Sequence, residues 1–315
     1  MSKHPAVSVI IVSYNTCDMT CACIKSVLAE GKDVDQEVIV IDNCSNDSSA
    51  DAIAQQFPSV TLIRSKDNLG FGKGNNVAAL QATGDYILLL NPDTVVLDNA
   101  VGKLLDFAVR KPEAKLWGGK TLFSDGSLNP ASAWAFMSLW SLIAGAAGLS
   151  MVFPTSNLFN PEAYPSWDRN SEREVELITG CFLLMKRNFW QELGGFDEKF
   201  YIYAEEADLC IRAIEKGARP TTTPLAEIVH YGGASETVRA GKLIRLYSGR
   251  ATLIHKHWPK SKAALGVLVM KLHVLIRASL YGLSGLIRRN GNHKTAGAEW
   301  WHVWTSRKSW ENGYA

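Results

Sequence analysis

Residues 7–15, VSVIIVSYN, decide the fold class, because an apolar β-branched run that ends in polar residues is typical of a strand buried on both faces. Three further runs of this kind follow within the first 125 residues, at Glu37–Ile41, Val60–Ile63 and Tyr86–Leu90. Helical patterns separate the four runs, at Asp18–Ala29, Ser48–Gln56 and Lys73–Thr83. This alternation predicts an α/β fold with a mostly parallel sheet that helices cover on both faces.

Polar residues follow each of these strands, at the edge where parallel sheets bind their ligands. They are Ser13–Asn15, Asp42–Asp47, Ser65–Asn76 and Asn91–Thr94. Asp42 can accept a hydrogen bond from a ligand, or it can simply belong to a strand–turn–helix connection. The glycine-rich NLGFGKGNN at 68–76 opens a helix, where backbone N–H groups favour phosphate. Asp93, in an Asn-Pro-Asp turn, can hold Mg²⁺ or Mn²⁺ at a diphosphate or can be an ordinary turn residue.

A second block extends from about 170 to 233. We predict a strand at Val175–Lys186, a short helix at Asn188–Leu193 and a helix at Glu206–Lys216 that Gly217 ends. His230 ends a later strand and is either a metal ligand or a structural histidine.

Three carboxylates, those of Glu205, Glu206 and Asp208, lie at the start of the predicted helix. Acidic residues stabilise a helix N-terminus, which explains part of this cluster. A general base is the functional alternative, because crowded carboxylates raise one another's pKa.

The composition is that of a folded globular protein. The chain has 315 residues, 47% of them hydrophobic and 20% charged, which excludes disordered, collagen-like and small disulfide-rich classes. The N-terminus MSKHPAVSVIIVSYN does not have the architecture of a signal peptide, so we expect the six cysteines to be reduced thiols in a cytosol. Cys17, Cys21 and Cys23 lack a second ligand pair at zinc spacing and are predicted to be structural.

The net charge of +2 averages two unlike parts. Residues 241–315 carry 13 Lys and Arg against two acidic residues, a local charge of +11, and residues 1–240 carry −9. A basic tail on an acidic body predicts an anionic partner such as a membrane surface, a nucleic acid or a phosphorylated substrate.

Two apolar segments raise the question of a membrane. Residues 131–153 are uncharged and long enough to span a bilayer. Residues 263–287 form a mostly apolar helical pattern with basic residues in one stripe, which suits a helix lying in the membrane interface or, alternatively, a core helix with a solvated edge. The stripe comprises Lys262, Gly266, His273, Arg277, Ser284 and Arg288, and Arg289 and Lys294 follow it.

Six segments in order resemble the motifs of family 2 glycosyltransferases, which have the GT-A fold. They are SVIIVSYN, VIVIDNCSND, NLGFGKGNN, LLLNPD, GGFDEKFYIYAEEADLC and VHYGGAS, and they cover residues 7 to about 235. The resemblance is greatest to the bacterial rhamnosyltransferase-like members that build O-antigen, cell-wall or capsular polysaccharide.

The resemblance implies a role for each matching residue. Asp42 would bind the nucleobase, Asp93 and His230 would hold a divalent metal (Mn²⁺ or Mg²⁺), and Glu206 would be the catalytic base, with Glu205 as the alternative. The nucleotide-sugar site would comprise Ser13, Tyr14, Asn15, Asp42, Asn68, Gly70, Phe71, Lys73, Asn75, Asn91 and Asp93, and Asp208 would belong to the catalytic carboxylates. This chain departs from the family pattern at Asn91, which replaces the first Asp of the metal motif, and at Glu206, which replaces the more usual Asp.

The implied function is inverting, metal-dependent transfer of a sugar from a nucleoside-diphosphate sugar, with dTDP-rhamnose preferred. The acceptor would be a hydroxyl of a glycan or of a polyprenyl-diphosphate-linked saccharide. Residues 1–240 would form the catalytic domain, with a nucleotide-sugar half at 1–125 and an acceptor half at 126–240, and residues 241–315 a membrane-associating tail. The protein would be cytoplasmic and peripheral on the inner face of the cell membrane. Because Asp93 and Glu206 would share one site, a membrane span at 131–153 is not expected.

Two other function classes stay open. One is a catalytically idle nucleotide-sugar-binding subunit of another enzyme. The other is a nucleic-acid-binding protein whose tail tryptophans stack on bases, namely Trp300, Trp301, Trp304 and Trp310. A nucleotide-sugar site favours the membrane over nucleic acid as the partner of the tail.

Overall fold

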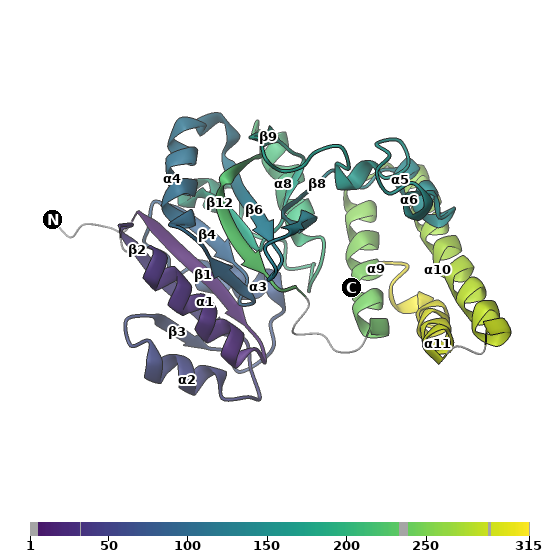
Figure 1. Ribbon diagram of the computed structural model, residues 1–315, viewed down its shortest axis with the longest axis horizontal. Helices are drawn as coiled ribbons and strands as arrows, with labels where there is room; N and C mark the ends of the chain where they lie inside the picture. The colour runs from purple at the N-terminus through teal and green to yellow at the C-terminus, as the bar shows by residue number, and fades with distance from the viewer. Residues whose placement is uncertain (1–5, 32, 233–238, 289–290, 315) are drawn as a thin grey trace. The chain divides into compact units, whose positions relative to one another are not determined.

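The computed structural model describes residues 6–31, 33–232, 239–288 and 291–314 (Figure 1). The end of the VHYGGAS motif and Arg289 lie outside these residues. The chain divides into two compact units. We call the first the sheet unit (1–134, 167–198 and 205–235) and the second the helical unit (135–166, 199–204 and 236–315).

The sheet unit is built on one large mixed sheet, in the strand order β3-β2-β1-β4-β11-β6-β12-β5. Its strands are β1 (Val7–Ser13), β2 (Gln36–Asp42), β3 (Thr61–Arg64), β4 (Tyr86–Leu90), β5 (Thr94–Val96), β6 (Leu116–Leu122), β11 (Phe182–Lys186) and β12 (Thr221–His230). The short strands β7 (Leu128–Asn129) and β9 (Arg173–Glu174) pair with β6 and β12, and β8 (Ala133–Trp134) pairs with β10 (Leu177–Ile178). Strands β3, β2, β1 and β4 are parallel, so their polar carboxyl ends lie on one edge.

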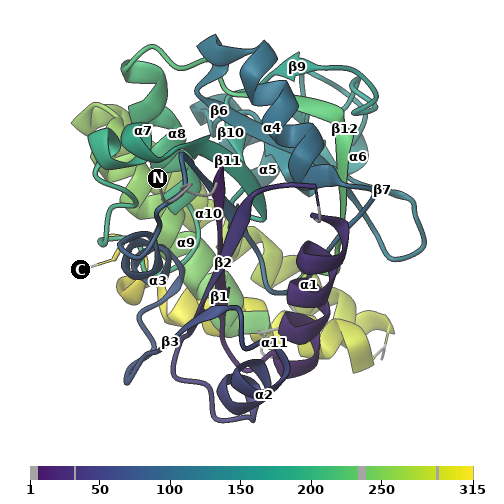
Figure 2. The same cartoon turned by 90° about the vertical axis from the view of Figure 1, so that its left-hand side faces the viewer.

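Helices cover both faces of this sheet (Figure 2). They are α1 (Cys17–Glu30), α2 (Ser49–Gln56), α3 (Phe71–Ala79), α4 (Ala100–Arg110), α7 (Arg187–Leu193) and α8 (Glu205–Glu215). Val7, Val9 and Ile11 of β1 pack in one core with residues of α1 and α4. Val12 points the other way, toward Gly74 of α3. A strand buried on both faces reads as a continuous apolar run, which is why β1 is predictable from its sequence.

The predicted fold class is confirmed, and so is the parallel order of β3, β2, β1 and β4. The prediction that the strand near 60–63 is buried is wrong, because β3 is at the edge of the sheet and leaves Thr61 and Arg64 exposed. The prediction of one strand at Val175–Lys186 is wrong, because the chain breaks into β10 and β11, which belong to different sheets. At the break, the Thr179 N–H donates to the Ser132 carbonyl and the Gly180 N–H donates to a carboxylate. These bonds replace the regular strand pairing that the apolar pattern suggested.

The helical unit contains α5 (Leu139–Ala146), α6 (Leu149–Val152), α9 (Arg239–His257), α10 (Lys260–Arg288) and α11 (Gly291–Thr305). A separate core lies among these helices, with Tyr247, Met270, Val274 and Trp310 buried in it. The apolar segment 131–153 forms two short helices that Gly148 separates with φ +75°, so it is not one long helix. Within the described residues, Lys260–Ser284 alone is long and apolar enough to cross a membrane, with a mean hydropathy of 1.7.

Candidate active site

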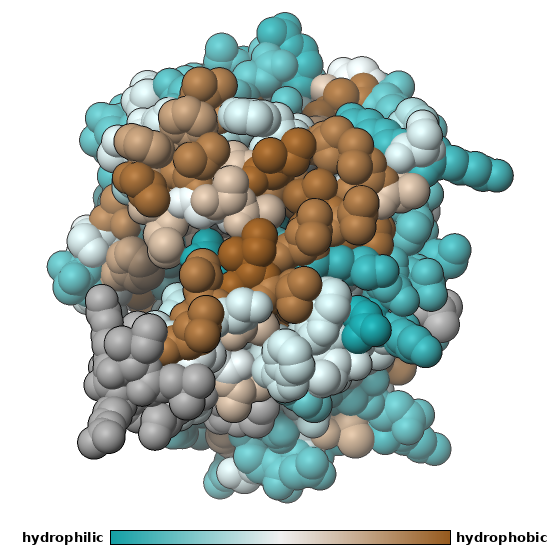
Figure 3. All heavy atoms as spheres, turned by 90° about the vertical axis from the view of Figure 1, so that its right-hand side faces the viewer, coloured by the Kyte–Doolittle hydropathy of each residue, from teal (hydrophilic) through white to brown (hydrophobic). Residues whose placement is uncertain are grey.

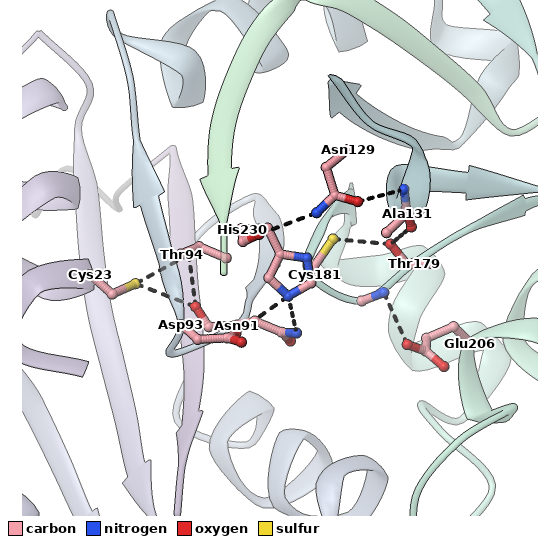
Figure 4. Close-up of polar contacts among 11 residues, drawn as sticks. Cys23, Asn91, Asp93, Thr94, Asn129, Ala131, Thr179, Cys181, Glu206 and His230 are labelled. Atoms are coloured by element: carbon pink, nitrogen blue, oxygen red, sulfur yellow. Dashed lines mark hydrogen bonds and ion pairs between the residues drawn. The ribbon is translucent and has the colours of Figure 1, made fainter. Parts of the chain in front are cut away.

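Asp93 and His230 meet at the end of the sheet although 136 residues separate them in the sequence. Strand β12 pairs antiparallel with β5, and this register places His230 opposite Thr94. The Nε2 atom of His230 therefore lies 3.4 Å from Oδ1 of Asp93 and 3.4 Å from Nδ2 of Asn91 (Figure 4). Burial alone would lower the pKa of His230, but the neighbouring Asp93 and Cys181 raise it to about 10.

The turn that carries Asp93 is held by hydrogen bonds from three elements. The hydroxyl of Thr94 donates to the Asn91 carbonyl at 2.7 Å, and the buried thiol of Cys23 on α1 lies 3.5 Å from the same carbonyl. The Tyr231 N–H donates to the Asp93 carbonyl at 3.0 Å. Asn129 donates from its amide to the His230 carbonyl at 3.2 Å. Both candidate ligands are therefore positioned before any ligand binds.

This cluster fits a divalent ion that is bound together with a phosphate-bearing substrate. The carboxylate and the amide oxygen suit Mg²⁺ or Mn²⁺, and the imidazole suits a transition-metal ion such as Mn²⁺, which on binding would displace the proton that the raised pKa of His230 favours. Oδ1 of Asn91 is buried and has no hydrogen-bond partner among the described residues. This oxygen, beside Asp93 and His230, is therefore available to coordinate a metal ion. The described residues contain no group of three or more His, Cys, Asp or Glu side chains suited to a metal ion. Mg²⁺ sites commonly use one or two carboxylates and take further oxygens from substrate phosphates.

Glu206 lies beside the same edge, linked to the cluster through residues 179–181. The Gly180 N–H donates to Oε1 of Glu206 at 3.2 Å, and the next residue, Cys181, accepts the Asn91 N–H through its carbonyl at 3.3 Å. The thiol of Cys181 also lies 3.0 Å from the hydroxyl of Thr179 (Figure 4). One short segment therefore contacts the candidate base on one side and the candidate metal ligands on the other.

The three carboxylates at the start of α8 have different surroundings. Glu205 is 2% exposed and its Oε2 has no hydrogen-bond partner in the described part of the chain; burial and the neighbouring Glu206 raise its pKa well above the usual value. Glu206 is only half-buried, and burial raises its pKa as well. Asp208 is fully buried and forms an ion pair with Arg212 at 2.8 Å. Of the three, Glu206 is therefore the carboxylate with access to a substrate.

Asp42, at the end of β2, carries an unused acceptor atom. It is 5% exposed, its Oδ2 accepts the Ser45 N–H at 3.2 Å, and its Oδ1 has no partner among the described residues. A buried carboxylate oxygen without a partner costs free energy unless a ligand supplies a donor. This atom is suited to an N–H group of a nucleobase.

The loop after β1 joins the loop after β2. Asn15 adopts φ +53°, its N–H donates to Ser45 at 3.0 Å, and its side chain accepts the Asn46 N–H at 2.8 Å. The hydroxyl of Ser13 is buried and lies 2.9 Å from that of Thr20, and Tyr14 is half-buried in the same loop. The buried hydroxyl of Ser13 therefore packs beneath the loop and is not at its surface, whereas Asn15 fixes the shape of the exposed part.

The glycine-rich segment is tied to the same edge by Asn43. Its amide donates to Oδ1 of Asn68 at 3.0 Å and to the Gly70 carbonyl at 3.1 Å, and its Oδ1 accepts the Leu69 N–H at 2.8 Å. Gly70 has φ +78°, a conformation that favours glycine, and α3 begins at the next residue, Phe71.

The other residues expected in this segment have partners of their own. Phe71 lies against Gly180, since a Cβ atom on that glycine would come within 2.9 Å of its ring. Lys73 pairs with Glu198 at 3.1 Å on the surface, and the side chain of Asn75 donates to the Phe71 carbonyl.

A model of the family described as Glycosyl transferase family 2 matches residues 8–189 of the chain. The chain belongs to this family.

Curated relatives and solved structures agree with this assignment. The glycosyltransferase is 29% identical over 275 residues to an N-acetylglucosaminyl-diphospho-decaprenol L-rhamnosyltransferase of Mycobacterium tuberculosis, covering 77% of this chain and 84% of the relative. It is 28% identical over 237 residues to rhamnosyltransferase WbbL of Escherichia coli, covering 71% and 83%. Its fold is similar to that of mannosyltransferase PcManGT from Pyrobaculum calidifontis, solved in complex with GDP-Man and Mn²⁺, with a TM-score of 0.58, 14% identity and coverage of 98% and 88%. The protein is thus a rhamnosyltransferase-like glycosyltransferase with the GT-A fold.

Sequence reasoning missed several residues that position this glycosyltransferase's site. They are Asn129, Thr179, Gly180 and Cys181. Each acts through a backbone hydrogen bond to a residue far away in the sequence, and no local pattern signals such a bond. Asn43 lies in the segment Asp42–Asp47 that the sequence placed at this edge, and its contacts with residues 68–70 came only from the structure.

Proposed function

We propose that this glycosyltransferase transfers a sugar from a nucleoside-diphosphate sugar to a hydroxyl group in one displacement that inverts the anomeric carbon. The observation that carries the proposal is the link through residues 179–181 between Glu206 and the Asp93–His230 pair. An inverting displacement needs a base on the acceptor side and charge stabilisation on the leaving-group side. The geometry supports both at one edge of the sheet.

Asp42 would accept a hydrogen bond from the nucleobase through its free Oδ1, and the loop at 68–71 would lie along the ribose and diphosphate. Asp93, His230 and the amide oxygen of Asn91 would hold a divalent ion. When bound, the ion neutralises the negative charge that develops on the departing nucleoside diphosphate.

Glu206 would take the proton of the acceptor hydroxyl as the oxygen attacks the anomeric carbon. The Gly180 N–H orients this carboxylate, and the raised pKa brings it nearer to the range in which a general base is efficient. Glu205 is buried and has little access to an acceptor, so it would not compete for this role.

We further propose rhamnose from dTDP-rhamnose as the sugar and a polyprenyl-diphosphate-linked saccharide as the acceptor, in polysaccharide synthesis on the inner face of the cell membrane. The names of the two rhamnosyltransferase relatives, one with a diphospho-decaprenol acceptor, support this choice. Residues 1–240 would then be the catalytic domain and residues 241–315 the membrane-associating tail, with the basic charge of the tail as support.

A screen of nucleotide sugars for Mn²⁺-dependent release of nucleoside diphosphate tests the proposal. We expect dTDP-rhamnose to give the greatest release, and EDTA to abolish it. Binding of a donor without release would instead indicate a catalytically idle subunit. Full release after exhaustive EDTA treatment would contradict the metal-dependent mechanism.

A further inference from the structure

Helix α10 is apolar on two opposite faces, and only one of them is buried. Val267, Met270, Val274 and Ala278 face the core of the helical unit. A second set of apolar side chains on α10 is 39–57% exposed, and it comprises Leu265, Leu268, Leu272, Ile276, Leu280 and Leu283. Their spacing of three or four residues places them in one outward-facing stripe. Six large aliphatic side chains in one solvent-facing stripe are unusual for a soluble surface.

The stripe continues onto α5 and α6, which lie against α10. Leu142 and Ala146 of α5 share a buried core with α10, and Nη1 of Arg277 lies 3.7 Å from the sulfur of Met151. These two helices and the residues after them expose further large apolar side chains, namely Trp140, Ile143, Met151, Val152, Phe153 and Leu158. Figure 3 shows hydrophobic side chains gathered on this side. We call the two sets together the apolar face.

The charge beside the apolar face is positive. On α10 the cations Lys262 and Arg277 lie in one basic stripe, about a quarter-turn around the helix from the exposed leucines. Lys262 is exposed and lies over the ring of Trp258 at 4.5 Å, which leaves its charge free for a phosphate. No acidic residue occurs in 139–153 or in 260–288. An apolar stripe with cations along its border is the arrangement of helices that lie in a bilayer interface.

We propose that the apolar face inserts in the plane of an anionic bilayer, with the exposed leucines of α10 among the acyl chains and the basic stripe at the lipid phosphates. The proposal deepens the proposed function, on which it rests only for the lipid-linked nature of the acceptor. The proposed function attributes membrane association to the basic charge of the tail. This proposal instead names the surface that contacts the membrane, and two separate segments form it, α5–α6 and α10.

The structure favours this arrangement over a membrane span and over a second copy of the chain. In the apolar window of α10, 33% of the residues are buried inside the protein, and Lys271 pairs with Glu311 at 2.7 Å, so lipid cannot surround the helix. A symmetric dimer through the apolar face would bring two basic stripes of the same sign together. A bilayer with anionic headgroups offers acyl chains to the exposed leucines and phosphates to the basic stripe.

Co-sedimentation of the full chain with vesicles tests the proposal, with phosphatidylcholine alone and with added phosphatidylglycerol. We expect binding to the anionic vesicles and release by alkaline carbonate. The double variant Leu272→Glu/Leu280→Glu should bind at least about tenfold more weakly, because each change removes apolar area from the acyl region and adds a charge there. A matched control is Leu80→Glu/Val109→Glu on the sheet unit, whose side chains are 82% and 70% exposed and should leave binding unchanged.

The basic border has its own variant. Lys262→Gln should weaken binding to anionic vesicles by about fivefold and leave the weak binding to neutral vesicles unchanged. Three results would each overturn the proposal. They are an equal loss of vesicle binding in the α10 variant and in the sheet-unit control, retention on the vesicles after alkaline carbonate, and a lipid-free dimer that does not bind vesicles. Mn²⁺-dependent donor hydrolysis in the same samples separates the two claims, since the Leu272→Glu/Leu280→Glu chain should keep it. If the native chain shows no hydrolysis with any donor, the proposed function fails. The vesicle result then still shows whether the apolar face binds a bilayer.

Discussion

The clearest test of the site compares two adjacent carboxylates, through Glu206→Gln and Glu205→Gln. Gln keeps the oxygen that accepts the Gly180 N–H at 3.2 Å, so Glu206→Gln should fold normally while losing the ability to take a proton. Glu205 is buried, and burial with the neighbouring Glu206 raises its pKa and so favours the neutral acid, which Gln closely matches in shape and polarity. The two variants therefore make the same chemical change one residue apart, with opposite expected results.

Removal of a general base costs about 10²- to 10⁴-fold in rate, or roughly 2.7–5.4 kcal/mol of transition-state stabilisation. We expect this loss in kcat for Glu206→Gln, with the KM of the donor nearly unchanged because the carboxylate of Glu206 bonds to the Gly180 N–H and Gln keeps that contact. For Glu205→Gln we expect a kcat within about threefold of the native value, since Glu205 is 2% exposed and out of reach of a substrate.

The pH dependence gives a second readout. Burial raises the pKa of Glu206 above its ordinary 4.5, so native activity should fall as the pH drops through that raised pKa. The folded chain also keeps a proton on Glu205 that the unfolded chain releases above pH 4.5. The native free energy of unfolding should therefore fall, relative to Glu205→Gln, by about 1.4 kcal/mol for each pH unit above 4.5 until Glu205 itself ionises.

The assays are steady-state release of nucleoside diphosphate with saturating Mn²⁺, and denaturant unfolding at several pH values. Near-native kcat for Glu206→Gln would remove Glu206 from the role of base. A loss of 10² or more in Glu205→Gln, with an unchanged unfolding midpoint, would show that the two assignments are reversed.

Three further predictions follow from single contacts. Asp42→Asn should raise the donor KM by roughly 10- to 100-fold with little change in kcat, since a charged hydrogen bond is lost; a change in kcat alone would contradict the nucleobase contact. Asp93→Ala should raise the Mn²⁺ concentration for half-maximal activity at least about tenfold, whereas an unchanged metal titration would place the ion elsewhere. Burial, with the nearby Arg277 and Arg250, lowers the pKa of His273 to about 4, so its contribution to stability is present at neutral pH and is lost as the pH falls from 6.5 toward 4. His273→Gln should therefore lack an acid destabilisation of up to about 3 kcal/mol, measured by unfolding at pH 7 and pH 4.5.

Local sequence patterns were sufficient for the parallel half of the sheet. Strands β1, β2 and β4 are buried on both faces, so their apolar runs have no competing helical period. The same reasoning failed at 175–186, where an apolar run continues across a break. The break depends on hydrogen bonds to Ser132 and Glu206, which lie far away in the chain, and residue preferences within a window do not contain that information.

The candidate site divides in the same way. Residues directly after strands, such as Asp42 and Asp93, were predictable because parallel strands deliver their carboxyl ends to one edge. The pairing of Asp93 with His230 depends on the antiparallel register of β12 against β5, which only the folded sheet defines. The outward leucines of α10 likewise needed the structure, because both of its faces are apolar in sequence and only packing selects the buried one.

The interrupted strand has a consequence for the chemistry. In a regular strand over 175–186, the N–H of Gly180 would bond to a neighbouring strand and would not reach Glu206. Because the chain breaks there, this N–H bonds to Glu206, the proposed base, while the next carbonyl, that of Cys181, accepts the Asn91 N–H beside the proposed metal ligands. The residue at the break must also be small, since a Cβ atom on Gly180 would come within 2.9 Å of the Phe71 ring and 3.3 Å of Cγ of Glu206. The break that made the strand prediction wrong is therefore what joins Glu206 and Asn91 through two consecutive residues.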